Sequence, residues 1–433
     1  MKRRSFLKTA AAAGAASVLA PGLVGLTASS CAKNPADPSA ASSAASGWNF
    51  DEIIDRSGTW SIKYRRAEGD KLAMWIADMD FKTDPVVSQA LRERLDRDVM
   101  GYTYAPDAFF DAIVGWEKSQ HGFDVPREWV WYAPGVIASL CQIYLAFTEP
   151  GDKIVVQTPV YDPFFNYAKR LGRTVVENPL VWKDGRYEMD FDGLDRLYDK
   201  RMKLLVLCNP HNPVGIIWSG ETLARLAEWC DRHGVLVVSD EIHADLALYG
   251  KHHTPFCNVS ETAARVGIQL GSPTKTFNIP GITGTAYCVI PDPDKRKRFR
   301  ETLENVKMAE PSIPTLVATI AGYTHEPLWL NAVREYLGEN AARVGRFFEE
   351  RDLRIRPVLP QASFLVWLDC RALGLPQDEL VALFNEKAGV VVNNGAGYGT
   401  GGEGFVRLNI GCPRSIVDEA LERVARAVAV LSR

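Results

Sequence analysis

Residues 203–215 read KLLVLCNPHNPVG, and residues 235–243, one helical stretch further along, read VLVVSDEIH. Each segment holds an uninterrupted apolar run that ends in polar residues. Between them, Leu223, Leu226 and Trp229 recur at the spacing of one helix face within residues 221–233. Apolar strands that alternate with helices are typical of a parallel sheet buried on both faces. This strand–helix–strand unit therefore predicts an α/β fold.

Working outward, apolar runs bounded by turn residues predict further strands at 153–157, 267–270, 285–289, 364–368 and 404–409. Helical patterns cover long stretches of 294–349 and recur at 377–387 and 415–430. The 433 residues are enough for two or three domains. We expect a large α/β domain, residues 95–310, with a mostly parallel sheet flanked by helices. A smaller α+β domain is expected from residues 48–94 and 311–433.

The composition is that of an ordinary globular protein. Lys and Arg number 50 against 53 Asp and Glu, a formal net charge of −3, which argues against a dedicated nucleic-acid-binding protein. The eight cysteines are scattered and form no CxxC pair, so most are expected to be small buried apolar residues. No metal site is predicted, since the spacing of zinc ligands is missing.

The first residues have the layout of an export signal. Arg3 and Arg4 lie in a short basic segment, and an Ala/Leu/Val-rich stretch follows from Ala10 to Ala28. This layout predicts a twin-arginine signal peptide, residues 1–30, and a flexible Ala/Ser/Pro-rich linker, residues 31–47. The protein is therefore expected to use the twin-arginine export machinery and to reach the periplasm or the outer face of the cytoplasmic membrane.

Two alternatives stay open for this segment. An uncleaved membrane anchor or a chance basic start would explain the same residues. In addition, Cys31 follows Leu26-Thr27-Ala28-Ser29-Ser30, which loosely resembles a lipobox, so Cys31 is a candidate lipid anchor. Its lipidation is left undecided by the sequence.

Four polar features fall at or near strand ends, where open α/β sheets bind ligands. They are the loop Asn209–Gly215, Asp240, Lys275 and Arg407. Each has an ordinary structural explanation by itself: a rigid loop, a helix cap, a solvated surface amine and a structural ion pair. The last three also have a chemical explanation, because a buried carboxylate needs a partner, a desolvated lysine becomes nucleophilic, and a buried arginine recognises carboxylates.

The order and spacing of these features resemble the fold-type-I pyridoxal-phosphate (PLP) enzymes of the aspartate aminotransferase superfamily. Within it, the chain is most similar to the MalY/PatB cystathionine β-lyase subfamily, from about Trp48 to its end. The motifs that carry this resemblance are DRSGTW at 55–60, IADMDF at 76–81, GY at 101–102, TPVYDPF at 158–164, DEIH at 240–243, KTFNIPG at 275–281 and GCPR at 411–414. Many aminotransferases carry an arginine several residues after the lysine, where this chain reads Ile282-Thr283-Gly284.

The resemblance implies a role for each residue around the cofactor ring. Lys275 would hold PLP covalently and later move the Cα proton of the substrate. Asp240 would bind the ring nitrogen and keep it protonated, so that the ring accepts electrons. Asn212 would donate to the ring oxygen, Tyr161 would stack on the ring face, and His243 lies where that oxygen or its surroundings are reached.

The resemblance also implies a phosphate site and a substrate clamp. The residues implied at the phosphate are Gly135, Val136 and Ile137 at a helix N-terminus, the hydroxyls of Ser272 and Thr274, and Tyr102 from a neighbouring subunit. A homodimer with shared active sites is therefore expected. Arg407 would bind the α-carboxylate of a small amino-acid substrate.

The function implied is a PLP-dependent carbon–sulfur β-lyase that cleaves cystathionine or a related cysteine S-conjugate to a thiol, pyruvate and ammonia. An aminotransferase of class I/II shares every catalytic residue and is the main alternative. A non-catalytic, PLP-loaded binding or regulatory protein is the other. The motifs do not decide between β-elimination and transamination.

Overall fold

The structure, a computed structural model, describes residues 47–183 and 186–431, which belong to one compact unit of the chain. The predicted signal segment, residues 1–30, and the predicted linker up to residue 46 lie outside the described residues. The boundaries predicted between a large and a small domain are not tested by this unit and stay a prediction.

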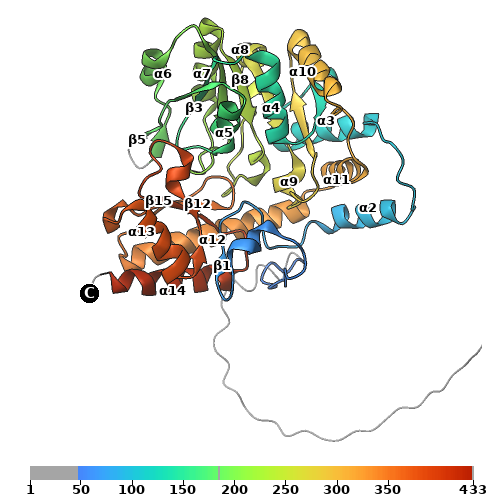
Figure 1. The fold of residues 1–433 in the computed structure, drawn as a ribbon. Helices are drawn as coiled ribbons and strands as arrows, with labels where there is room; N and C mark the ends of the chain where they lie inside the picture. The colour runs from blue at the N-terminus through green and yellow to red at the C-terminus, as the bar shows by residue number, and fades with distance from the viewer. Residues whose placement is uncertain (1–46, 184–185, 432–433) are drawn as a thin grey trace, which may run out of the picture. The chain divides into compact units, whose positions relative to one another are not determined.

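The largest sheet of the described chain has seven strands and lies between helices (Figure 1). In spatial order its strands are β2 (Val130–Ala133), β10 (Ala286–Val289), β9 (Gly267–Gly271), β8 (Leu236–Asp240), β7 (Met202–Cys208), β3 (Lys153–Val156) and β4 (Thr174–Glu177). The strands from β9 to β4 are parallel to one another, and β10 runs antiparallel to both of its neighbours. The mostly parallel sheet expected from the sequence is therefore present.

Helices cover both faces of this sheet, which explains its uninterrupted apolar strands. Leu204 and Val206 face a core formed with α4 (Val136–Phe147), α5 (Pro163–Arg170) and α10 (Pro293–Asn305). Leu205 and Leu207 face the opposite core, to which α3 (Asp107–His121), α7 (Gly220–His233) and α8 (Glu261–Val266) contribute. Because successive side chains of a strand point to opposite faces, every position must be apolar when both faces are covered.

A second, antiparallel sheet lies in the C-terminal part of the chain. Its strands, in spatial order, are β11 (Arg356–Val358), β12 (Leu365–Asp369), β15 (Phe405–Asn409) and β14 (Asn393–Asn394). The helices α12 (Leu328–Arg351), α13 (Gln377–Ala382) and α14 (Arg414–Val430) belong to the same region. The helix expected over 377–387 is in fact α13 followed by a π-helical turn, Leu383–Lys387.

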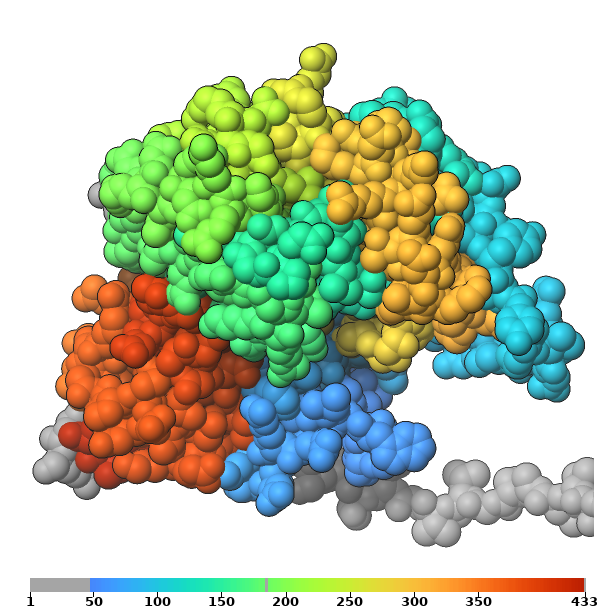
Figure 2. Space-filling view, turned by 45° about the horizontal axis from the view of Figure 1, so that its top comes forward, coloured from blue at the N-terminus to red at the C-terminus, as the bar shows by residue number. Residues whose placement is uncertain are grey.

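The first described residues pack against this C-terminal region. The short strand β1 (Leu72–Ala73) pairs in parallel with β13 (Val390–Val391), more than three hundred positions later. Figure 2 shows the early segment in blue beside the orange-red C-terminal segment. The remaining elements include α2 (Pro85–Leu95), the hairpin of β5 (Val181–Lys183) and β6 (Arg186–Glu188), α6 (Phe191–Leu197), α9 (Pro273–Thr276) and α11 (Ile313–Thr324).

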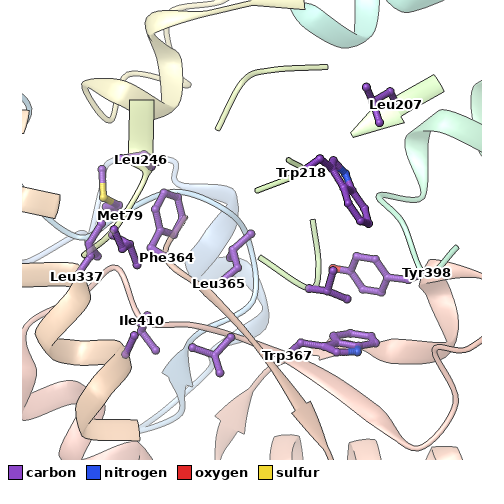
Figure 3. Packing of buried hydrophobic residues seen from close by; sticks show 14 of the residues in the cluster. Met79, Leu207, Trp218, Leu246, Leu337, Phe364, Leu365, Trp367, Tyr398 and Ile410 are labelled. Atoms are coloured by element: carbon purple, nitrogen blue, oxygen red, sulfur yellow. The ribbon is translucent and has the colours of Figure 1, made fainter. Parts of the chain in front are cut away.

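One apolar core joins the two sheets. It contains Leu207 and Trp218 next to the large sheet, Phe364 and Trp367 from the small one, and Met79 from the early segment (Figure 3). Cysteines behave as expected: of the seven in the described residues, six are buried and none forms a disulfide. In residues 47–183 and 186–431 no helix is long and apolar enough to span a membrane.

Candidate active site

The register of three parallel strands brings the predicted site residues together. Cys208 lies opposite Asp240, and Asp240 lies opposite Leu270, so β7, β8 and β9 end at the same edge of the sheet. A cavity of about 530 Å³ opens at this edge. Eight of the predicted residues line it: Val136, Ile137, Tyr161, Asn212, Asp240, His243, Lys275 and Arg407.

Lys275 enters the cavity from α9, the short helix that follows β9. Ser272 caps this helix, because its hydroxyl accepts a hydrogen bond from Thr274 N (3.1 Å). The Lys275 amine donates to the backbone oxygen of Ala77. Desolvation lowers the pKa of Lys275 to about 8, although nearby carboxylates act in the opposite direction. An amine with this pKa is available in its neutral, nucleophilic form near neutral pH.

Asp240 ends β8 as a buried carboxylate. Its Oδ1 accepts a hydrogen bond from Ile242 N (3.1 Å), and it forms no ion pair with any described residue. Desolvation raises the pKa of Asp240 to about 7. A buried carboxylate without a cation calls for an outside donor, because ionising it alone is costly. The protonated nitrogen of a pyridine ring is such a donor.

Arg407 lies at the centre of β15 and is 2% exposed. Its Nη1 donates to Asn212 Oδ1 (3.0 Å) and its Nη2 donates to Trp75 O (2.7 Å). Its Nε is buried and has no hydrogen-bond partner in the described part of the chain, nor is any carboxylate paired with it there. The structural ion pair considered for this arginine is therefore not found among those residues. A buried guanidinium in this state fits an external carboxylate.

The Asn212 side chain is oriented by the same contact. Because its Oδ1 accepts from Arg407, the Nδ2 group is left to donate elsewhere, and no described residue accepts from it. The amide therefore presents a donor in a cavity that also holds the lysine and the carboxylate, as expected for a residue facing the oxygen of the cofactor ring.

His243 and Tyr161 complete the walls. Desolvation lowers the pKa of His243 to about 3, so the imidazole is neutral, and its buried Nδ1 has no partner within residues 47–183 and 186–431. Desolvation raises the pKa of Tyr161 to about 12, which keeps the phenol protonated. Both groups therefore enter the cavity as uncharged polar side chains.

The N-terminus of α4 faces the same cavity through Val136 and Ile137. Gly135 precedes the helix with a φ of 107°, a conformation that favours glycine. The first amides of a helix have no acceptor within the helix, and its dipole attracts negative charge. This end of the cavity is therefore suited to a phosphate group.

Four predicted residues do not line the cavity: Gly135, Ser272, Thr274 and Tyr102. Ser272 is occupied locally: its hydroxyl contacts Thr274 Oγ1 (2.8 Å) and donates to the backbone oxygen of Thr285. Tyr102 is fully exposed. The phosphate contacts predicted for Ser272, Thr274 and Tyr102 stay predictions.

Sequence reasoning missed several residues of the wall. Trp75 and Ala77 act through backbone oxygens, which leave no side-chain signal. Tyr398, whose ring lies 5.4 Å from the Arg407 guanidinium, belongs to a Gly-rich turn that reads as a loop. Arg66 and Asp162 also line the cavity, and neither was selected because charged residues are mostly solvated.

The residues present fit pyridoxal phosphate. The lysine, the buried carboxylate without a cation, the amide donor and the helix N-terminus correspond to its aldehyde, ring nitrogen, ring oxygen and phosphate. With a parallel sheet whose strand ends carry these groups, the fold and the site define a PLP-dependent enzyme.

Comparison with known proteins identifies the family. The family model for aminotransferase class I and II matches residues 70–424, and the chain belongs to this family. It is 41% identical to cystathionine beta-lyase PatB of Bacillus subtilis, covering 88% of this chain and 100% of that protein. It is 34% identical to protein MalY of Escherichia coli, covering 88% and 99%.

A solved structure agrees. Cystalysin from Treponema denticola, which contains a pyridoxal 5′-phosphate cofactor, superimposes with a TM-score of 0.85 at 32% identity, covering 89% of this chain and 99% of that one. The predicted family, fold class and cofactor are therefore confirmed. The role of each site residue stays a prediction.

Proposed function

We propose that this protein is a PLP-dependent carbon–sulfur β-lyase that cleaves L-cystathionine or a related S-substituted cysteine to a thiol, pyruvate and ammonia. The observation that carries the proposal is Arg407, a buried guanidinium without an ion-pair partner in the described residues, in the same cavity as Lys275. The relatives named above support it, and the lyase class predicted from the sequence is confirmed by them.

Each side chain then has a defined task. Arg407 binds the α-carboxylate and so orients the Cα–H bond, while the Lys275 amine removes the Cα proton. Asp240 pairs with the ring nitrogen and Asn212 donates to the ring oxygen. When bound, PLP withdraws electrons from Cα, which lets the β-thiolate leave. The released enamine hydrolyses in water to pyruvate and ammonium.

The test separates the lyase from the aminotransferase, which the family name alone also allows. With L-cystathionine as sole substrate and no keto acid, the lyase releases pyruvate, ammonia and homocysteine in equal amounts over many turnovers. A reaction that stops after one equivalent and restarts only when a keto acid is added would establish the aminotransferase instead.

We also propose a homodimer with shared active sites. Val99, Met100, Tyr102 and Tyr104 form a run of exposed apolar and aromatic side chains, which supports burial against a second copy. Light scattering tests the mass. A mixture of Tyr102→Phe and Lys275→Ala chains should regain activity, because mixed dimers contain one intact site; no gain on mixing contradicts a shared site.

We propose export by the twin-arginine route on the basis of Arg3-Arg4-Ser5-Phe6-Leu7-Lys8. This route carries folded proteins, so the enzyme would leave the cytosol with its cofactor. Arg3→Lys combined with Arg4→Lys should leave active enzyme in the cytosol. Cys31→Ser should release the exported protein from the membrane if Cys31 carries a lipid, and should change nothing if it does not.

A further inference from the structure

The cavity contains a second arginine for which the catalytic roles above have no use. Arg66 ends the 3₁₀ helix Ile62–Arg66 and lines the cavity together with Lys275 and Arg407. Its guanidinium lies 4.1 Å from the centre of the Trp75 ring. Among residues 47–183 and 186–431 it has no hydrogen bond and no ion pair. A guanidinium stacked on an aromatic face keeps the N–H donors at its edge free for a carboxylate.

Trp75 contacts both Arg66 and Arg407, the arginine that binds the substrate α-carboxylate. Its backbone oxygen accepts from Arg407 Nη2 (2.7 Å), and its indole N–H donates to Lys63 O (2.7 Å). The ring that carries Arg66 is therefore fixed by one hydrogen bond, and the carbonyl of the same residue fixes Arg407. Arg66 and Arg407 therefore contact the same residue, Trp75, and line the same cavity. Neither has an anionic partner in the described chain.

The charge of the cavity wall leaves this arginine available. Asp162 is the carboxylate that lines the cavity besides Asp240, and Asn166 Nδ2 donates to its Oδ2 (2.8 Å). No ion pair joins Asp162 or Asp240 to Arg66 in the part of the chain that the structure describes. A substrate with one carboxylate satisfies Arg407 alone, whereas a dicarboxylate satisfies both arginines.

We propose that Arg66 binds an acidic group at the far end of the sulfur substituent, and that the preferred substrates are cysteine thioethers with a distal carboxylate. As a statement about substrates this rests on the proposed lyase function. Arg66 acts in selectivity between substrates: it is exposed to solvent, so leaving it unpaired costs little when a neutral substituent is bound.

The test compares two amino acids that have no sulfur and cannot be cleaved. L-α-aminosuberate has the chain length of a carboxypropyl thioether with its distal carboxylate, and L-α-aminooctanoate has a methyl group in that place. Calorimetry on the PLP-loaded protein gives both dissociation constants. Arg66→Gln should lower the preference for aminosuberate over aminooctanoate about fivefold, the upper range for an ion pair at a solvent-exposed guanidinium.

Arg65→Gln is the matched control, because Arg65 is the exposed neighbouring arginine and does not line the cavity. It should leave the preference unchanged. A preference that moves less than threefold in Arg66→Gln, or an equal loss of affinity for both compounds, overturns the proposal; the second result would make Arg66 a merely structural residue.

Turnover distinguishes this inference from the proposed function. S-(carboxypropyl)-L-cysteine and S-butyl-L-cysteine are the cleavable counterparts, and the ratio of their kcat/KM values should fall in Arg66→Gln as the binding preference does. If neither thioether releases pyruvate in the wild-type enzyme while the binding preference still depends on Arg66, the lyase function fails and the distal-carboxylate site stands.

Discussion

Replacement of Arg407 by methionine should separate activity from stability. The wild-type guanidinium makes two hydrogen bonds, to Asn212 Oδ1 (3.0 Å) and Trp75 O (2.7 Å). At about 1.5–3 kcal/mol each, their loss removes roughly 3–6 kcal/mol of stabilisation. The same substitution relieves the desolvation penalty of a buried ion, which is also several kcal/mol. Trp75 O still accepts from Asn393 Nδ2 (3.1 Å). The two effects nearly cancel, so we expect Tm to shift by no more than about 5 °C.

The catalytic effect has no such compensation. A buried carboxylate–guanidinium pair contributes about 3–5 kcal/mol to binding. At about 1.4 kcal/mol per tenfold, kcat/KM for any α-amino-acid substrate should fall roughly 10²- to 10⁴-fold in Arg407→Met. Pyruvate release gives kcat/KM, the cofactor absorbance reports occupancy of the site, and calorimetric melting of the loaded protein gives Tm.

Arg351→Met is the matched control. Arg351 is half exposed and pairs with Glu422 (2.6 Å), a surface ion pair that contributes less than about 1 kcal/mol. It should leave both kcat/KM and Tm close to the wild-type values. The reasoning is refuted if Arg407→Met melts more than about 10 °C lower, since Arg407 would then be a structural support, or if kcat/KM falls less than tenfold.

Other substitutions and a pH series test the remaining roles. Lys275→Ala should abolish turnover and the PLP adduct that borohydride traps on the protein; mass spectrometry that finds the adduct on another lysine contradicts the assignment. Asp240→Asn should keep the fold by circular dichroism yet lower kcat by orders of magnitude, because the ring nitrogen loses its anionic partner; near-normal kcat would assign another residue to that nitrogen. Burial lowers the pKa of Lys275 to about 8, so its amine is protonated below that pH. The rate at which the apoprotein attaches PLP should therefore rise through about pH 8 and level off above it. A midpoint near pH 10.5 would mean that the pKa of the amine is not shifted. Lys63→Met should lower the free energy of unfolding by about 1.5–3 kcal/mol in urea titrations, because Asp80 loses its buried partner Lys63 (2.8 Å) but keeps Arg56 (2.9 Å). A loss below about 1 kcal/mol would show that Arg56 alone satisfies Asp80.

Much of the fold follows from local pattern. The seven strands expected from apolar runs agree with the observed ones to within one residue at each end. The strands that the sequence did not reveal are β2, β4, the β5–β6 hairpin and the short strands β1, β11, β13 and β14. The exposed or partly exposed faces of β4 and the hairpin interrupt the apolar run, and β4 lies at the edge of the sheet. A pattern of apolar residues detects central strands better than edge strands.

The residues of the site also differ in how far the sequence predicts them. Asn212, Asp240 and Lys275 could be predicted, because strand ends carry polar residues to one edge of a parallel sheet. Arg407 could be predicted because a charged residue stands inside an apolar strand. Trp75 could not, since its carbonyl and its ring face act here and neither depends on a recognisable motif. Arg66 could not either, because an exposed arginine near the end of a short helix is common.

The contacts of residues 75–77 have a consequence for the biogenesis of the protein. Ala77 O accepts from a lysine 198 positions later, and Trp75 O accepts from an arginine 332 positions later. Such pairings close very long loops and form late in folding. A chain still emerging from the ribosome lacks Arg407 until almost all of it has been synthesised, so the part of the site that contacts Trp75 is completed only near the end of synthesis. Truncation of the last thirty or so residues removes β15 and with it Arg407, so the shortened chain should be synthesised but should turn over no amino-acid substrate.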